Sequence, residues 1–328
     1  MVTPDFNKPR SDRTFLSCDW GTTSFRLNYV DAKKGRIIGR ISSPEGIKAV
    51  YKEWTNYSGP FNRIDFHLSL LKKKIKTLET KVRADLSSCR VIISGMASSS
   101  VGIKELPYSR LPLNMQTPNL HVEQLPESPH LPNDVYLVSG LRTDNDVMRG
   151  EETQLIGLDS IYGLETGTYL LAGTHCKHVS VQNRRAVDFK TFMTGELFEL
   201  ISTQSILSQS VSAPESASTG NEFEQGVQQI ADGNLLHNLF GVRTRDLLHH
   251  IDHSTNAEYL SGLLIGAELA DLTKSRSDEI LIFGSTKLQQ LYSRACATLF
   301  LNARCADTNP ETSITALGHR LILQQIIN

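Results

Sequence analysis

The sequence lacks a charge imbalance and any cysteine motif. Its 328 residues contain 34 lysines and arginines against 35 aspartates and glutamates, which gives a formal net charge of −1. No global field therefore favours a nucleic acid or an anionic membrane as partner, and any anion must be held by a local site. The odd number of cysteines and the absence of C-x-x-C spacing argue against a disulfide framework and a zinc ribbon. These cysteines are Cys18, Cys89, Cys176, Cys296 and Cys305.

Long apolar runs are also absent. No segment reaches the roughly 18 apolar residues that a membrane span needs. Residues 1–13 form a polar tail without the apolar stretch of a signal peptide. We therefore expect a cytoplasmic protein without a membrane partner. With 39% hydrophobic and 21% charged residues, the chain is typical of a globular protein long enough for two domains.

The first part of the chain has the pattern of an α/β domain. Apolar and alternating segments predict a β-meander, then two further strands. The predicted strands cover residues 14–18, 25–31, 36–42, 89–94 and 134–138. Between them, apolar residues spaced by three and four predict a helix over 66–82. Six of the twelve prolines lie in residues 106–132, which excludes a regular helix or central strand there and suggests a surface segment.

The second half repeats the opening of the first. An apolar strand from Thr168 reaches Gly173-Thr174 and a returning strand, as an apolar strand earlier reaches Gly21-Thr22. This similarity predicts two duplicated domains that face each other. A helix is expected to begin near Val147, and residues 208–221 are expected to form a serine-rich loop. The later predicted elements are helices over 194–207, 256–272, 288–297 and 313–327 and a strand that begins at residue 279 and runs into a glycine turn.

The glycine turns suggest phosphate binding. A backbone that turns through glycine points consecutive N–H groups into a concavity, and threonine hydroxyls add further donors. A third such turn, Gly284-Ser285-Thr286, lies between a buried strand and a helix, where a nucleoside would pass close to backbone. Asp19 precedes the first turn, and a carboxylate beside a polyphosphate requires a divalent cation, for which Mg²⁺ is suited. The alternative is that Asp19 only accepts hydrogen bonds from its own turn.

Six segments together resemble a known family. They are "DWGTTSFR", "GMASSSVG", "DVMRGEETQLIG", "AGTHCKHV", "FMTGEL" and "YLSGLLIGAE". In this order they are similar to 2-dehydro-3-deoxygalactonokinases, which belong to the actin-like, hexokinase-like ATPase superfamily. The resemblance covers nearly the whole chain from Phe15 onward. The segments "MRGEETQLIG" and "GTHCK" are highly specific, whereas "DWGTT" alone would indicate only the superfamily.

The resemblance implies an α/β fold of two ribonuclease-H-like domains around an ATP cleft. The first domain would cover residues 14–145 and hold the sugar acid, and the second would cover 146–328 and hold the adenosine, with the last helix packing back on the first domain. The implied reaction transfers the γ-phosphoryl group of ATP to the 6-hydroxyl of 2-dehydro-3-deoxy-D-galactonate. A small-molecule substrate and a homo-oligomer are the partners that we expect.

Carried over by position, the resemblance assigns nucleotide contacts to three segments. Asp19, with Gly21, Thr22 and Thr23, would form the first phosphate motif and hold the Mg²⁺. The second motif would comprise Gly173, Thr174, His175 and Lys177, in which the lysine offsets charge on the polyphosphate. Gly284 and Ser285 would contact the adenosine. In that third segment Lys287 and the glutamines depart from the small polar residues that the family pattern leads us to expect.

The resemblance also places the sugar-acid site. Asp146 is the expected general base, Asp144 its alternative, and Arg149 a candidate partner for the substrate carboxylate. The alternative for Arg149 is an ion pair with Glu45, Glu151 or Glu152. The pocket is expected to be lined by Glu45, Gly46, Ser98, Ser99 and Glu151, although the serine loop also fits a plain tight connection, and an acidic residue at a helix start also stabilises the helix.

The sequence allows three alternative interpretations. His175 and Cys176 are adjacent in a predicted strand and would point to opposite faces, which argues against a cysteine hydrolase. The histidines at 249, 250 and 253 lack a matching ligand set and fit a solvated helix end better than a metal site. A nucleotide-dependent switch or sugar sensor on the same fold, or a kinase of a different 2-keto-3-deoxy sugar acid, stands as the alternative function.

Overall fold

The computed structural model describes residues 13–212, 221–229, 233–275, 278–307 and 311–327. The expected tail, except for Arg13, and positions 213–220 of the expected serine-rich loop lie outside these residues. Within them, the contacts divide the chain into two compact units. Unit 1 comprises 13–165, 184–187 and 311–327, and unit 2 comprises 166–183 and 188–307. No helix in the described ranges is long and apolar enough to cross a membrane.

A six-stranded sheet in the order β3-β2-β1-β4-β8-β7 forms the centre of unit 1. Its strands are β1 (Thr14–Trp20), β2 (Phe25–Asp31), β3 (Ile37–Ser43), β4 (Arg90–Gly95), β7 (Val122–Gln124) and β8 (Val135–Val138). The first three are antiparallel, whereas β1, β4 and β8 run parallel. The carboxyl ends of β1 and β4 therefore lie side by side, which is where parallel sheets carry their ligand sites.

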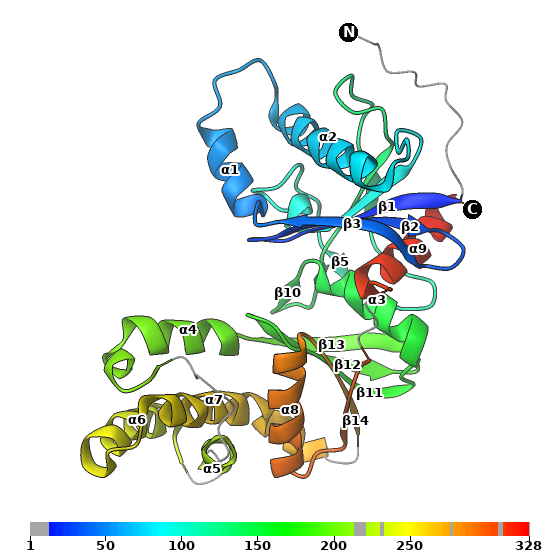
Figure 1. Ribbon diagram of the computed structural model, residues 1–328. Coiled ribbons are helices and arrows are strands. Elements are labelled where there is room, and N and C mark those ends of the chain that lie inside the picture. The colour runs from blue at the N-terminus through cyan, green and yellow to red at the C-terminus, as the bar shows by residue number, and fades with distance from the viewer. Residues whose placement is uncertain (1–12, 213–220, 230–232, 276–277, 308–310, 328) are drawn as a thin grey trace. The chain divides into compact units, whose positions relative to one another are not determined.

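Helices cover both faces of this sheet (Figure 1). α1 (Ile47–Thr55) and α2 (Arg63–Val82) lie on one face, where Leu71 and Ile75 pack against Leu16 and Trp20 in the apolar core. On the other face, α9 (Ile314–Ile327) packs against β1, β4 and α3 (Glu151–Tyr162). A buried hydrogen bond of 2.8 Å joins Ser17 of β1 to Nδ1 of His319 on α9.

The proline-rich segment contributes short strands instead of long regular elements. A three-stranded sheet has the order β10-β9-β5. Its strands are β5 (Ser109–Arg110), β9 (Leu141–Arg142) and β10 (Val147–Met148). Two other short elements of unit 1 are β6 (Leu113–Asn114) and the single-turn η1 (Met96–Ser98). β6 pairs with residues 185–186 of unit 1, at the start of β13.

The sheet of unit 2 repeats the topology of unit 1. Its order is β15-β14-β11-β12-β13, with β6 beyond β13. The strands are β11 (Thr166–Leu171), β12 (Cys176–Gln182), β13 (Arg185–Phe192), β14 (Glu279–Phe283) and β15 (Ala303–Cys305). β11 is antiparallel to β12 and parallel to β14, as β1 is to β2 and β4. The expected duplication and the α/β fold class are thus confirmed.

Five α-helices and two 3-10 segments accompany the sheet of unit 2 in the part of the chain that the structure describes. They are α4 (Thr194–Gln204), η2 (Ile206–Gln209), α5 (Glu222–Gln229), α6 (Leu235–His249), α7 (His253–Leu269), η4 (Ala270–Ser275) and α8 (Thr286–Thr298) among the described residues. Phe223 of α5, Ile265 of α7 and Tyr292 of α8 pack against the strands in one apolar core. A second apolar cluster lies between α6 and α7 around Val242 and Leu260.

Two boundaries differ from the sequence-based expectation. Residues 147–148 are a strand, and α3 begins only at Glu151. The reason is Gly150, whose φ of 109° is incompatible with a helix and open mainly to glycine. The division between the units falls after Glu165, not after residue 145, because α3 packs against α9 within unit 1.

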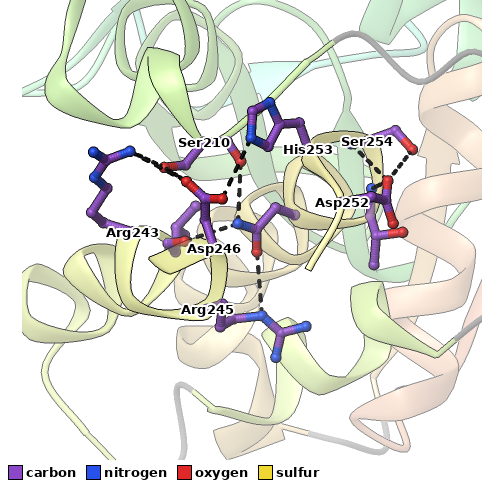
Figure 2. A network of polar contacts seen from close by, with 10 residues as sticks. Ser210, Arg243, Arg245, Asp246, Asp252, His253 and Ser254 are labelled. Carbon is purple, nitrogen blue, oxygen red and sulfur yellow. Dashed lines mark hydrogen bonds and ion pairs between the residues drawn. The ribbon is translucent and has the colours of Figure 1, made fainter. Parts of the chain in front are cut away.

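His253, one of the three histidines near residue 250, belongs to a polar junction between α6 and α7 (Figure 2). Asp246 accepts hydrogen bonds from Ser210 at 2.8 Å and Arg243 at 3.2 Å, and His253 lies 3.5 Å from its other oxygen. These hydrogen bonds and the nearby His253 lower the pKa of Asp246. Asp252 caps α7 by accepting from the N–H groups of residues 254 and 255. The contacts of His253 are thus structural.

Candidate functional site

Asp19 lies at the carboxyl end of β1, beside Ser94 of β4. Its carboxylate accepts a hydrogen bond of 2.9 Å from Arg26, its partner across the β1–β2 hairpin. Burial raises the pKa of Asp19, the charge of Glu151 adds to the increase, and Arg26 opposes it. Two carboxylates near each other in a mostly buried place are a donor set that a hard divalent cation suits.

Two glycines let the backbone close around Asp19. Gly95 ends β4 with a φ of 88°, and a Cβ there would lie 2.8 Å from the carbonyl oxygen of Trp20. A Cβ on Gly150 would lie 3.2 Å from the Cα of Gly95. Hence only residues without a side chain fit at these two points. Their close approach brings the N-terminus of α3 to the ends of β1 and β4.

Arg149 is held by neutral acceptors. Its guanidinium donates to the carbonyl oxygen of Ser98 at 2.6 Å and to the Ser98 hydroxyl at 2.8 Å, and lies 4.1 Å from the ring centre of Tyr108. Within the described residues, no carboxylate lies close enough to form an ion pair with this side chain. These contacts of the guanidinium are thus with neutral groups, and a role of Arg149 toward the substrate carboxylate stays a prediction.

The serine loop after β4 differs from the expected ligand-contacting surface. Ser98 is fully buried, and its hydroxyl donates to the carbonyl oxygen of Val138 at 2.7 Å. The Ser99 hydroxyl donates to the carbonyl oxygen of Met96 at 2.7 Å. Because both hydroxyls are used inside the protein, direct contact of Ser98 with a ligand is not supported. In the structure the Ser98 hydroxyl contacts Val138 and Arg149.

Two glutamates stabilise the first turn of α3. Oε2 of Glu151 accepts from the N–H of Arg149 at 3.0 Å, and Oε2 of Glu152 accepts from the N–H of Gly150 at 2.7 Å. Glu152 is fully buried, and burial raises its pKa to about 8, with a further contribution from the charge of Glu151. The hydrogen bonds fix the loop that carries Arg149.

The first glycine turn packs against the start of α1. The carbonyl oxygens of Gly21 and Thr22 accept from the N–H groups of residues 47 and 48 at 2.9 and 3.0 Å. A Cβ on Gly46 would come within 2.4 Å of the Thr22 oxygen, which explains the glycine at this position. Thr22 and Thr23 are exposed. Glu45 forms an ion pair with Lys74.

The two candidate bases lie in the turn between β9 and β10. Asp144 is exposed and lies 3.4 Å from Arg110 and 3.7 Å from Arg142. Asp146 is half-buried, and its Oδ1 accepts from the N–H of Val147 at 2.7 Å. Asp146 thus precedes a short strand and not, as expected, a helix. The choice between the two as general base stays a prediction.

In unit 2, the turn from β11 to β12 is packed against the start of α4. A Cβ on Gly195 would lie 2.9 Å from the Cα of Thr174 and 3.0 Å from the carbonyl oxygen of Gly173. The side chains of His175 and Glu196 meet at 2.5 Å across this junction. Gly195 lies in the segment "FMTGEL", for which no site role is predicted from the sequence alone. The local signal is a glycine in the first turn of a helix, three residues after the end of β13.

The next residues of this turn point inward. Lys177 is buried with 4% of its surface exposed, and its ammonium group lies 3.4 Å from the carbonyl oxygen of His175. The Cys176 thiol lies 2.8 Å from the hydroxyl of Tyr292, and burial raises its pKa to about 12. His175 is exposed and pairs with Glu196, so Cys176 and His175 have separate surroundings. This arrangement agrees with the argument against a cysteine nucleophile.

The ends of β11 and β14 meet beside a cavity. A Cβ on Gly284 would lie 2.7 Å from the carbonyl oxygen of Ala172, and Ser285 caps α8. A cavity of about 1070 Å³ is lined by the turn at Gly173, the start of α4, one face of α7, and α8. Its volume is at the upper end of the range for small-molecule sites. Glycine turns, a helix start and this cavity together could hold a nucleotide.

The duplicated sheets, with glycine turns at corresponding strand ends, define a two-domain α/β fold of the actin-like and hexokinase-like type. A family model described as 2-keto-3-deoxy-galactonokinase matches residues 19–318. The chain therefore belongs to the 2-keto-3-deoxy-galactonokinase family. It is an enzyme that uses ATP to phosphorylate an alcohol group.

Individual relatives agree with this assignment. The chain is 32% identical over 304 residues to a probable 2-dehydro-3-deoxygalactonokinase of Rhizobium meliloti, which covers 90% of this chain and 92% of the relative. It is 31% identical over 238 residues to 2-dehydro-3-deoxygalactonokinase of Escherichia coli, with 70% and 78% covered. A crystal structure of a "putative 2-dehydro-3-deoxygalactonokinase protein" from Sinorhizobium meliloti superposes with a TM-score of 0.77 at 28% identity, covering 95% and 97% of the two chains.

Proposed function

We propose that the chain transfers the γ-phosphoryl group of ATP to the 6-hydroxyl of 2-dehydro-3-deoxy-D-galactonate. The adenosine and phosphates bind in the cavity of unit 2, against the turns at Gly173 and Gly284 and the helix start at Gly195. The observation that carries the proposal is this cavity at the carboxyl ends of β11 and β14, since glycine turns there offer N–H groups to phosphate oxygens.

The sugar acid is assigned to unit 1. Arg149 offers a positive charge that is held by neutral groups, and a guanidinium can meet a carboxylate with two hydrogen bonds. The loop around Glu45 and Gly46 lies on the first glycine turn and completes the proposed pocket. Asp146 takes the proton of the attacking hydroxyl, which contributes roughly 10²- to 10⁴-fold to the rate.

A magnesium ion fits the residues around Asp19. The carboxylate lies at a strand end with Glu151 close enough to raise its pKa; the backbone of Gly95 lies beside one of its oxygens, and Arg26 contacts the other. Asp19 would hold the ion, directly or through water, with Glu151 nearby. When bound, Mg²⁺ neutralises charge on the phosphate oxygens. The near-neutral net charge gives no electrostatic attraction for a nucleic-acid partner.

One assay tests the proposal. ATP consumption is measured with a panel of 2-keto-3-deoxy sugar acids that includes the galactonate and gluconate stereoisomers, and the phosphorylated carbon is located by NMR. We expect the highest kcat/KM with the galactonate isomer and phosphorylation at carbon 6. Preference for another acid would reassign the substrate. Nucleotide binding without turnover on any acid would instead favour a sensor.

A further inference from the structure

A buried carboxylate behind the cavity wall of unit 2 connects three of the elements that line it. Glu268 lies on α7, and only 1% of its side chain is exposed. Its Oε1 accepts from Nε2 of His178 on β12 at 2.8 Å. Its Oε2 accepts from the hydroxyl of Tyr292 on α8 at 2.7 Å and from the hydroxyl of Thr194, the first residue of α4.

These partners are linked directly to the cavity surface. Thr194 and Tyr292 both line the cavity, whereas Glu268 does not. The hydroxyl of Tyr292 also lies 2.8 Å from the Cys176 thiol, at the end of the turn that begins at Gly173. One carboxylate therefore sets the distance between the phosphate turn, the start of α4 and the face of α8.

The site suits a carboxylate. Two hydroxyl groups donate to one oxygen of Glu268, and the other oxygen lies beside Nε2 of His178. An ionised acid satisfies these contacts directly, whereas an amide would require His178 to change tautomer and accept through Nε2. Burial, followed by the charge of Glu268, raises the pKa of Tyr292, so the phenol keeps its proton and remains a donor. Because a buried polar group left without a partner is costly, a change at Glu268 is expected to shift these contacts.

We propose that Glu268 is a positioning residue for nucleotide binding, which holds Thr194 and Tyr292 so that the cavity fits the ligand. This inference rests on the proposed nucleotide site in unit 2. Its effect is on affinity for ATP and ADP, with little effect on the affinity for the sugar acid. Residues that hold a binding surface from behind are expected to matter because small displacements of the contacting groups weaken binding.

The test measures ADP binding and kinetics of Glu268→Gln, Tyr292→Phe and Thr194→Val. We expect Glu268→Gln to raise the Kd of ADP and the KM of ATP about tenfold, equal to roughly 1.4 kcal/mol, with the sugar-acid KM unchanged. The single-donor variants should show smaller changes in the same direction. ADP protection of Cys305, which is exposed and lines the cavity, from alkylation gives a second readout at this site.

Asp159→Asn is the matched control. Asp159 of unit 1 is also a buried carboxylate with 1% of its side chain exposed, and it pairs with Arg184 at 2.8 Å. Its replacement should lower the melting temperature without changing the Kd of ADP. If Glu268→Gln binds ADP as the wild type does, or if Asp159→Asn weakens binding equally, the inference is wrong.

Two other outcomes are distinguishable. If Glu268→Gln does not fold, Tyr292→Phe and Thr194→Val decide the matter, and unchanged ADP affinity in both would overturn the inference. If the wild-type protein itself binds no ADP, the proposed nucleotide site fails, and the positioning role of Glu268 fails with it.

Discussion

Arg26 donates a hydrogen bond of 2.9 Å to the carboxylate of Asp19 across the β1–β2 hairpin. The pair is asymmetric, because 58% of the Arg26 side chain is exposed and only 16% of that of Asp19. Arg26 therefore opposes the increase in the pKa of Asp19 that burial causes. It also occupies an oxygen that a cation would use, so the two compete for the carboxylate.

Replacement of Arg26 should change the pH dependence of catalysis. In Arg26→Gln the pKa of Asp19 rises further, and the ionised form is lost at a higher pH as the solution is acidified. We expect the acid limb of kcat/KM to move to higher pH by about half a pH unit to one pH unit. The profile is measured at saturating Mg²⁺, with Lys72→Gln on α2 as a variant that removes an exposed positive charge elsewhere. An unchanged acid limb would show that Asp19 does not control it.

Replacement of Asp19 itself should act through the metal. Asp19→Asn keeps the size of the side chain and removes the charge that would hold Mg²⁺. We expect kcat/KM for ATP to fall at least about 100-fold and half-maximal activity to require more Mg²⁺. Sugar-acid binding, measured by calorimetry without nucleotide, should change little. A magnesium requirement equal to that of the wild type would remove Asp19 from the metal site.

The general base can be assigned by comparing two neighbouring aspartates. Asp146→Asn should lower kcat roughly 10²- to 10⁴-fold while ADP still binds, because only proton removal is lost. Asp144→Asn should stay within about threefold of the wild type, since Asp144 is exposed and near two arginines. Single-turnover rates with both variants decide the question. The reverse pattern would make Asp144 the base.

Local patterns were sufficient to predict the strands, the glycine turns and the position of Asp19. Each of these depends on a few adjacent residues, and the repeated Gly-Thr turn indicated the duplication that the two sheet orders confirm. The helix expected to begin near Val147 is present but begins at Glu151, because residues 147–148 form a strand and the φ of Gly150 is incompatible with a helix.

Contacts between distant segments were not predictable. The approach of Gly150 to Gly95 and the use of Ser98 to hold Arg149 depend on how α3 returns to β4. Likewise, Glu268 meets residues that lie 90 and 74 positions earlier in the chain. Glu268 lies in α7 among apolar and small residues. None of these sequence neighbours indicates that its carboxylate is buried and contacts side chains of three other elements.

Glu152 should make the stability of the protein depend on pH. Burial raises its pKa from 4.5 to about 8, so the folded protein binds this proton more tightly than the unfolded chain does. The corresponding contribution to the free energy of unfolding is complete below about pH 4.5 and is lost as the pH rises through about 8. Between pH 6 and pH 9 the wild type should therefore lose about 3 kcal/mol through this group.

The comparison uses Glu152→Gln, which keeps a neutral side chain of the same size. Urea unfolding at pH 6 and pH 9 should show a smaller loss for this variant than for the wild type, so that its relative stability improves at high pH. Glu165→Gln, at an exposed position beyond the end of α3, is the control and should follow the wild type. Equal losses in all three proteins would mean that Glu152 is already ionised at pH 6, held as a carboxylate by Gly150 and Thr153.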